Sequence, residues 1–528
     1  MISSLCLALL APPSVPPPSL PAPPRPKLVV LITVDQLRPD YLDRWKGQLS
    51  GGLFQLVTEG AVFAEGYQDH AVTETAPGHS TVLSGRWPAH TGIIRNSQGV
   101  QDSTAQLVGV PGSVGGASPR RFRGTALLDW LRAADPGARA LSVSVKDRGA
   151  ILPLGSARAD VYWLSFQTGQ FTTSRYYADS LPPWVKAFNA KMRSPGPWSL
   201  LLADSAYHED DDEPWENGGR NRTFPHAVPA CAAVPGPACA ATPALDSTTL
   251  ELAWAGVAAL RLGRRSDTDL LAVSLSATDL IGHAFGPDSR EIHDQVLRLD
   301  RALGWFLKRL LDRVGRDNVV VVLTADHGVT SFPERTRAKT GAQAYRVSLD
   351  TLVTAVNREL DRLVGAGTPR QWLSFETGML FLQDNGRFAA TGVKTDSVLD
   401  AAAARIRAVA GVGRVDAVPD LARADTASDP VARRWLHQLT DDAGVVLVVT
   451  LQPGSVWASE PPIAMHGQPT EDDSHVPIIF WGRVVKRGIY RGRANTVDIA
   501  PTLGRLLGIT PLSLVDGRVL TDALAPRN

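Results

Sequence analysis

The sequence lacks a surplus of charge of either sign and lacks any long hydrophobic run. Its 528 residues include 54 lysines and arginines against 53 aspartates and glutamates, a formal net charge of +1. Binding to the phosphate backbone of nucleic acids needs a surplus of basic side chains on one face, so the balance argues against nucleic acid as a specific partner. A membrane-spanning helix needs about 20 apolar residues in a row, and no such run occurs, so we expect no transmembrane segment.

Cysteine is scarce, with three residues in the whole chain. Cys6 lies in a short apolar segment, residues 1–11, which a proline-rich stretch follows up to residue 26. We interpret residues 1–26 as an export leader and a tether, which predicts a periplasmic or secreted protein, although the positive charge that usually begins a leader is missing. The other two, Cys231 and Cys239, favour a disulfide that closes a small surface loop, with two unpaired thiols as the alternative.

The rest of the chain has the composition and periodicity of a globular α/β protein. β-type runs alternate with amphipathic helical runs, which is the pattern of a mainly parallel central sheet with helices on both faces. We expect strands at residues 28–34, 138–145, 270–276 and 318–324, and a long helix at 292–314.

Two long segments interrupt this pattern, at about 152–247 and 329–471. The first contains the acidic run 209–213, which we interpret as a solvated loop rather than a metal site, and the second has helices and strands of its own. We expect one domain over residues 27–528, with these two segments as insertions. They would cover the C-terminal ends of the strands, where open α/β sheets bind their ligands.

Chemically capable side chains follow the predicted strands. They are Asp35 after the first, Lys146 and Arg148 (VKDRG) after the second, Asp279 and His283 (DLIGH) after the third, Asp326 and His327 (ADHG) after the fourth, and His475 (SHVP) near the end. Imidazole and carboxylate form a ligand set that suits zinc, and six such ligands could hold two ions about 4 Å apart. A single DxxxH is frequent by chance, whereas a DH pair at a buried strand end is more specific, because unpaired polar groups there are costly.

The segment TETAPGHS, residues 73–80, contains the candidate nucleophile, Thr75. The proline that follows favours a first helical turn, so the Thr75 hydroxyl can lie at a helix N-terminus, where free N–H groups attract phosphate oxygens. A metal ion bound to this oxygen would lower its pKa and make an alkoxide accessible. The alternatives are a threonine that only caps the helix, and Thr73 as the reactive residue. We expect His79 to serve in packing or to support the ligands.

Taken in order, Asp35, TETAPGHS, Asn96, VKDRG, DLIGH, ADHG and SHVP resemble the alkaline phosphatase superfamily, in particular its threonine-nucleophile, phosphate-irrepressible periplasmic branch. The resemblance spans residues 29 to about 507. It implies an alkaline-phosphatase-like catalytic domain with one zinc ion held by Asp279, His283 and His475. It implies a second held by Asp35, Asp326, His327 and the Thr75 oxygen. It further implies that Asn96, Lys146 and Arg148 contact phosphate oxygens, with the two basic residues in place of a magnesium ion, so we expect two zinc ions per chain and no magnesium.

The resemblance predicts an alkaline phosphatase that hydrolyses small phosphate monoesters in two in-line displacements, through a phosphothreonine intermediate. Formal charges support a monoester. Two zinc ions, three aspartates and an alkoxide sum to zero, so Lys146 and Arg148 leave about +2 to match the monoester dianion. A phosphodiesterase or nucleotide pyrophosphatase shares the ligands and the threonine and is the alternative, although it typically lacks the Lys-x-Arg pair.

Two other classes fit less well. A sulfatase would need cysteine or serine in the place of Thr75, in a C/S-x-P-x-R context. A non-enzymatic binding protein could keep a metal cluster for stability alone, but structural zinc sites are normally closed by four protein ligands. The predicted set of Asp279, His283 and His475 leaves one position open. We therefore predict an enzyme, and we favour a monomer.

Overall fold

The computed structural model describes residues 25–113, 115–193, 195–228, 241–363, 371–383 and 394–525. Cys231, Cys239 and nearly all of the expected leader and tether lie outside the described residues. Within the described ranges, no helix combines the length and the apolar character that crossing a membrane requires.

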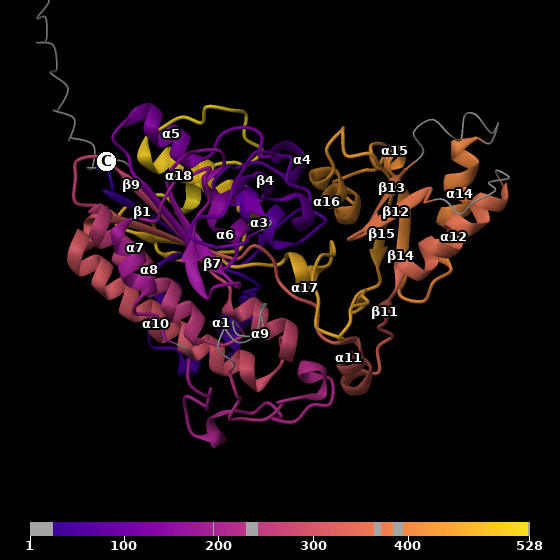
Figure 1. Cartoon of the computed structure of the whole chain (residues 1–528), viewed down its shortest axis with the longest axis horizontal. Helices are drawn as coiled ribbons and strands as arrows, with labels where there is room; N and C mark the ends of the chain where they lie inside the picture. Colours follow the sequence, from indigo (N-terminus) through magenta and orange to yellow (C-terminus); the bar gives the residue numbers. More distant parts are fainter. Residues whose placement is uncertain are drawn as a thin grey trace, which may run out of the picture.

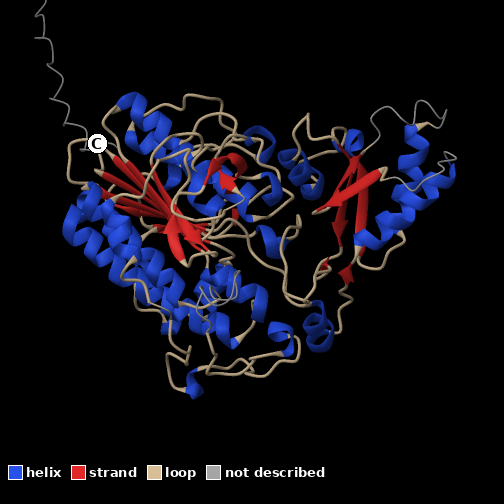
Figure 2. Cartoon of the chain, in the orientation of Figure 1, coloured by secondary structure: helices blue, strands red, loops and turns tan. Residues whose placement is uncertain are grey.

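A nine-stranded sheet forms the centre of the larger part of the molecule (Figures 1 and 2). The strand order is β18-β2-β17-β10-β1-β9-β6-β7-β8. The parallel strands at its centre are β10 (Val319–Thr324), β1 (Leu28–Val34), β9 (Asp269–Leu275), β6 (Ala140–Ser144) and β7 (Asp160–Ser165). Antiparallel pairing brings in β17 (Ile478–Gly482) next to β10, β2 (Ala61–Phe63) next to β17, and β8 (Gln170–Thr172) next to β7. The last strand, β18 (Gly488–Tyr490), is parallel to β2. The prediction of a mainly parallel α/β sheet is confirmed.

Helices cover both faces of this sheet because the strands are apolar on both sides. All seven residues of β1 are buried, and successive side chains enter opposite cores, Val30 on one face and Val29 on the other. Helices α2 (Gly52–Glu59), α8 (Ala244–Leu260), α9 (Ala277–Phe285) and α10 (Arg290–Val314) cover the first face. Helices α3 (Thr75–Val82), α5 (Leu127–Ala134), α6 (Asp147–Ile151) and α18 (Ile499–Leu507) cover the second (Figure 1).

The first predicted insertion, 152–247, begins too early. β7 and β8 lie within it and extend the central sheet, because Val161 and Trp163 pack into the same core as β1. The remainder contains α7 (Pro183–Asn189) and the short helix η5 (Glu216–Gly219), joined by long loops. The acidic run is tied down by pairing: Glu209 contacts His293 at 2.8 Å, and Lys339 pairs with Glu213 at 2.9 Å.

Residues 329–471, which we call the smaller unit, include a separate four-stranded antiparallel sheet (Figure 2). Its strand order is β12 (Leu373–Glu376), β13 (Met379–Leu382), β15 (Val445–Leu451) and β14 (Val412–Ala417). Helices α12 (Leu349–Leu363) and α14 (Thr395–Arg407) cover one face, and α15 (Val418–Leu421) and α16 (Pro430–Gln438) cover the other. Trp435 of α16 packs with Ala71 and Ile94 of the larger part, so the two sheets are joined by an apolar contact.

Candidate active site

The C-terminal ends of four neighbouring parallel strands bring the predicted residues to one edge of the central sheet. Asp326 follows β10, Asp35 follows β1, Asp279 lies in the first turn of α9 directly after β9, and Lys146 follows β6. The strands are in register: Thr33 is opposite Thr324, and Val34 is opposite Leu275. Residues from distant parts of the chain therefore meet where α/β sheets bind their ligands.

Asp279, His283 and His466 form a first group of candidate metal ligands. The Nε2 atoms of His283 and His466 each lie 3.4 Å from Asp279 Oδ1, and they lie 3.2 Å from each other. His283 Nδ1 donates to Ala464 O at 2.6 Å, and His466 Nδ1 donates to Thr73 O at 2.7 Å. Each bond fixes the tautomer that leaves a lone pair on Nε2. The lone pairs of three side chains therefore converge, as a divalent cation requires.

The structure places His466, and not His475, beside Asp279 and His283, so the predicted ligand set needs correction. His475 Nε2 bonds to Ala64 O at 2.9 Å, and its ring stacks on Tyr67. A backbone bridge between Tyr67 and His475 fixes this orientation, in which His475 lines a separate pocket of about 320 Å³. His466 is 183 residues further along the chain than His283. It lies in the segment AMHGQP, in which no motif or spacing indicates a metal ligand.

Asp35, His79 and Asp326 form a second group, and His327 lies beside it. His327 Nε2 is 3.3 Å from Asp326 Oδ2, and His327 Nδ1 donates to Gly328 O at 3.0 Å. Both His327 Nε2 and Asp326 Oδ2 are buried, and neither has a hydrogen-bond partner in the part of the chain that the structure describes. Buried polar atoms are nearly always paired, so two adjacent acceptors without donors fit a bound cation.

His79 lies between these carboxylates, but both of its ring nitrogens already have partners. Nδ1 contacts Thr75 O at 2.9 Å, and Nε2 contacts Ser274 Oγ at 3.0 Å. Its nitrogens also lie 3.2 Å from Asp326 and 3.6 Å from Asp35. His79 therefore holds the first turn of α3 against the aspartates, which is the supporting place expected for it.

Gln36 joins the two groups, and no sequence pattern indicates it. Its backbone N–H donates to Asp326 Oδ1 at 3.2 Å, and its side chain donates to Asp279 Oδ1 at 3.1 Å. The residue has a φ of +66°, which is uncommon outside glycine. A Cβ at Gly282 would lie only 1.8 Å from Gln36 Oε1. The glycine of DLIGH therefore lets α9 approach Gln36 closely.

Thr75 is the first residue of α3, and 1% of its surface is exposed. Lys146 Nζ lies 3.3 Å from Thr75 Oγ1, 2.5 Å from Asp279 Oδ2 and 3.0 Å from Asp35 Oδ2. The competing residue, Thr73, uses its hydroxyl to donate to Gln468 O and to accept from Gly467 N. Thr73 is therefore committed to the loop that carries His466, whereas the Thr75 hydroxyl faces the ammonium group of Lys146.

Asn96 and Arg148 complete the predicted set. Asn96 Oδ1 accepts from Ala76 N at 2.8 Å, so the amide NH₂ is left as a donor. Arg148 lies on α6 with 26% of its side chain exposed, and its Nε has no hydrogen-bond partner among the described residues. Its ion pair within these residues is a long one, 3.6 Å to Asp147. Both side chains thus keep N–H groups for an anion.

Burial and neighbouring charges shift the pKa values of three residues at the site. Burial by itself would raise the pKa of Asp279, but Lys146 and His283 hold this pKa well below its usual range. Burial would lower the pKa of Lys146, but the carboxylates of Asp279 and Asp35 raise it. Burial and the neighbouring His466 lower the pKa of His327 well below its usual range. These shifts favour an ionised Asp279, a charged Lys146 and a neutral His327, which are the forms that bind a cation and an anion side by side.

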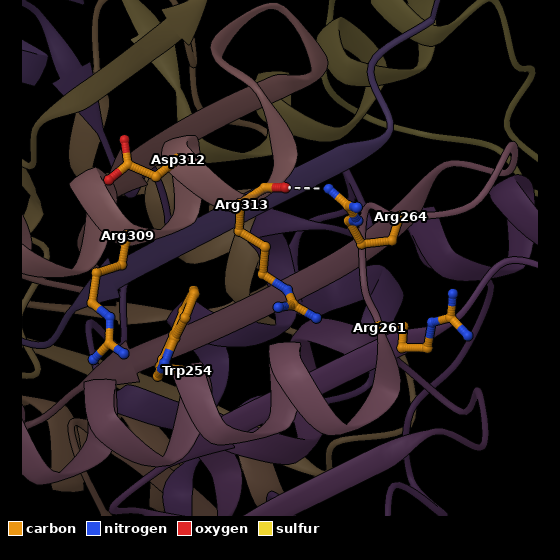
Figure 3. A pocket seen from close by; sticks show the side chains of 6 residues that line it. All are labelled: Trp254, Arg261, Arg264, Arg309, Asp312 and Arg313. Atoms are coloured by element: carbon orange, nitrogen blue, oxygen red, sulfur yellow. Dashed lines mark hydrogen bonds between the residues drawn. The ribbon is translucent and has the colours of Figure 1, made fainter.

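A second hollow lies on α8 and α10 (Figure 3), with a volume of about 590 Å³. Two of its arginines bond to carbonyl groups at the helix ends: Arg264 donates to Arg313 O at 2.8 Å, and Arg313 donates to Ala258 O at 3.5 Å. Arg309 lies over the ring of Trp254 at 4.5 Å. Capping and cation–π contacts account for these side chains, so this hollow is not a candidate active site.

Known proteins resemble this chain over nearly its whole length. The family described as type I phosphodiesterase / nucleotide pyrophosphatase matches residues 29–406. The alkaline phosphatases PhoV of Synechococcus elongatus and PhoK of a Sphingomonas species are each 34% identical to it. The PhoV match covers 95% of this chain and 93% of PhoV, and the PhoK match covers 94% and 91%. The crystal structure of the alkaline phosphatase PafA has a TM-score of 0.88 and 28% identity, and covers 96% of this chain and 100% of that chain.

The family match extends over more than half of the chain, and relatives of about one-third identity extend over nearly all of it. The resemblance to the alkaline phosphatase superfamily and the prediction of an enzyme are thereby confirmed. The chain is an enzyme that belongs to the type I phosphodiesterase / nucleotide pyrophosphatase family of the alkaline phosphatase superfamily.

Proposed function

We propose that this enzyme is an alkaline phosphatase that hydrolyses small phosphate monoesters with Thr75 as its nucleophile. One observation carries the proposal: the ammonium group of Lys146 contacts Thr75 Oγ1, Asp279 of the first ligand group and Asp35 of the second. The hydroxyl, a fixed cation and both candidate metal groups therefore meet at one point. The curated relatives PhoV and PhoK are themselves named alkaline phosphatases, which supports the same activity here.

The two ligand groups fit two zinc ions. Asp279, His283 and His466 would hold one ion, and Asp35, Asp326, His327 and the Thr75 oxygen would hold the other. The fixed Nε2 lone pairs and the orphaned acceptors Asp326 Oδ2 and His327 Nε2 support this assignment. Bound zinc would supply Lewis acidity, which lowers the pKa of the hydroxyl and stabilises charge on the leaving oxygen. Because Lys146 already lies between Asp279 and Asp35, we expect no magnesium ion.

The side chains of the enzyme can transfer the phosphoryl group in two displacements. Thr75 Oγ1 attacks phosphorus and displaces the alcohol, which gives phosphothreonine; water then displaces Thr75, restores the hydroxyl and releases phosphate. Charge in the loose transition state lies on the phosphoryl oxygens. The Asn96 amide and the Arg148 guanidinium are donors for those oxygens.

The charges of the site support a monoester substrate. Lys146 and Arg148 add two positive charges, and the dianion of a monoester balances them better than the single charge of a diester.

A second crystal structure of PafA carries substitutions of a threonine, an asparagine, a lysine and an arginine. Their spacings in sequence are those of Thr75 to Asn96 and of Lys146 to Arg148. This agreement supports treating the four residues as one set.

A phosphodiesterase or nucleotide pyrophosphatase is the second candidate, because the matching family carries that description. The location in the periplasm or outside the cell, inferred from residues 1–26, and the monomeric state are parts of the same proposal. They do not affect the choice between the two substrate classes.

The deciding experiment compares kcat/KM for an aryl monophosphate and a bis-aryl phosphate, with the zinc-loaded full chain. We expect the monoester to be preferred at least about ten-fold, since the diester loses charge-assisted hydrogen bonds. Thr75→Ala should abolish hydrolysis and the acid-stable phosphothreonine found after quenching, while Thr354→Val, at an exposed position of α12, should change neither. A preference for the diester would establish the second candidate, and full activity of Thr75→Ala would exclude the nucleophile.

A further inference from the structure

The turn of the β12–β13 hairpin extends from the smaller unit to the loop that carries Asn96. Thr377 Oγ1 donates to Glu74 Oε1 at 3.0 Å, and Glu74 Oε2 accepts from Asn96 N at 2.9 Å. The neighbouring Glu376 pairs with Arg95 Nη1 at 2.9 Å and accepts from Ser97 Oγ. Glu376 therefore holds residues 95 and 97 directly, and Thr377 holds residue 96 through Glu74.

Thr377 is a poor residue for the turn that it forms. Glu376 pairs with Met379, so Thr377 and Gly378 are the two central residues of a hairpin turn, with φ of +46° and +81°. Asn, Asp or Gly is preferred where a hairpin turn needs positive φ at both positions, and a β-branched residue is strained there. Backbone strain of this kind persists where the surroundings enforce it, often at functional sites. The hydroxyl contact with Glu74 gives a reason for threonine here.

Glu74 occupies the junction between the smaller unit and the nucleophile. It is the N-cap residue of α3, directly before Thr75, yet its side chain makes no cap hydrogen bond. Both of its carboxylate oxygens are instead used by Thr377 and Asn96. The methyl group of Thr377 also packs beside Gly467, next to His466, because a Cβ at Gly467 would lie 3.2 Å from Thr377 Cγ2. Thr377 thus touches the segments on both sides of the site.

We propose that Thr377 and Glu376 are positioning residues for the transferred phosphoryl group, acting through Glu74 and the 95–97 loop on the amide of Asn96. This inference rests on the function proposed above. Without the Thr377 hydroxyl, the Glu74 carboxylate loses one of its two donors and can rotate, and the backbone of Asn96 is then less firmly held. Small displacements of a group that contacts the transition state reduce the rate strongly.

The test measures kcat/KM for an aryl monophosphate in Thr377→Val, which keeps the β-branched shape and removes the hydroxyl. We expect a loss of about ten-fold, as for a hydrogen bond to a charged group, with unchanged metal content. Thr377→Ser should recover most of the activity, and Thr354→Val is the matched control on the same unit. In an Asn96→Ala background, Thr377→Val should cost little more, because the amide through which Thr377 acts is already absent.

Thr377→Gly separates positioning from structural support. Glycine suits the positive φ, so this variant should unfold at the same or a higher temperature while losing activity as Thr377→Val does. Full activity of either variant, or losses that add fully with Asn96→Ala, would overturn the proposal. If the unaltered chain hydrolyses no monoester, or if Asn96→Ala retains full activity, the proposed function is at fault rather than the role of the hairpin.

Discussion

His283 Nε2 and His466 Nε2 lie 3.2 Å apart, although 183 residues separate them in the chain. Two imidazole nitrogens that both present lone pairs repel each other unless a proton or a cation lies between them. The carbonyls of Ala464 and Thr73 take the Nδ1 protons and so hold both rings in this arrangement. The fold of the loop around residue 466 thus prepares a place for a metal ion next to Asp279.

The first prediction contrasts His466 with His475. His466→Ala should lower kcat/KM for an aryl monophosphate at least about 100-fold. It should also reduce the zinc content from the proposed two ions towards one, because loss of a direct ligand weakens metal binding more than loss of a residue that only supports a ligand. His475→Ala is the matched control and should keep both ions, since His475 bonds to Ala64 O away from the aspartates. Metal analysis after dialysis, together with steady-state kinetics, gives both values. Metal loss in His475→Ala instead would contradict the assignment.

The second prediction concerns the charge of Lys146. Lys146→Met should lower kcat/KM for a monoester by more than it lowers kcat/KM for a diester, because a positive charge matters more to a dianion than to a monoanion. Lys308→Met changes an exposed lysine on α10 and should leave the ratio unaltered. Equal losses for both esters would show that Lys146 does not discriminate by charge.

The third prediction uses the close approach of α9 to Gln36. Gly282→Ala would place a methyl group 1.8 Å from Gln36 Oε1, so either Gln36 or α9, which bears Asp279 and His283, must move. We expect a loss of stability of about 1–3 kcal/mol, as in other overpacked interiors, together with weaker zinc binding. Gly47→Ala is the control, because no atom of the described residues lies within 4 Å of a Cβ there. Thermal unfolding and zinc titration would show the effect, and a fully stable, zinc-loaded Gly282→Ala would refute it.

The fourth prediction is a dependence of stability on pH that comes from Glu216. Its side chain is 2% exposed, and burial followed by the charges of Glu291 and Glu213 raises the pKa of Glu216 to about 9. Between about pH 4.5 and 9 the folded chain holds a proton that the unfolded chain releases, so this group makes stability fall as the pH rises, by up to about 1.4 kcal/mol per unit.

Glu216→Gln removes this titration, so the mutant should gain stability over the unaltered chain as the pH rises from 5 to 9. Differential scanning calorimetry across this range measures the gain. Glu251→Gln, at an exposed position of α8, should show none. A gain that is the same at pH 5 and pH 9 would mean that Glu216 ionises normally in the folded chain.

The central strands and the residues that follow them could be predicted from sequence, because both depend on short runs of neighbouring residues. β1 has the expected boundaries, and the other three predicted central strands differ by one or two residues at their ends. Runs such as VVVVLT can be buried on both faces, and Asp35 or the Asp326–His327 pair directly after such a run must then lie at the edge of the sheet. Local order along the chain was sufficient for these inferences.

The choice between His466 and His475 was made only by the tertiary structure, and so were the roles of Gln36 and Thr377. Gln36 acts through Asp279 and Thr377 acts through Glu74, and both partners are far away in the sequence. Periodicity and short motifs do not predict contacts between residues so far apart in the chain. Sequence by itself determined the α/β class, the aspartates at the strand ends and the threonine of TETAPGHS, because these depend on burial and neighbouring residues. The completed ligand groups depend on how loops cross in space, which only the folded chain defines.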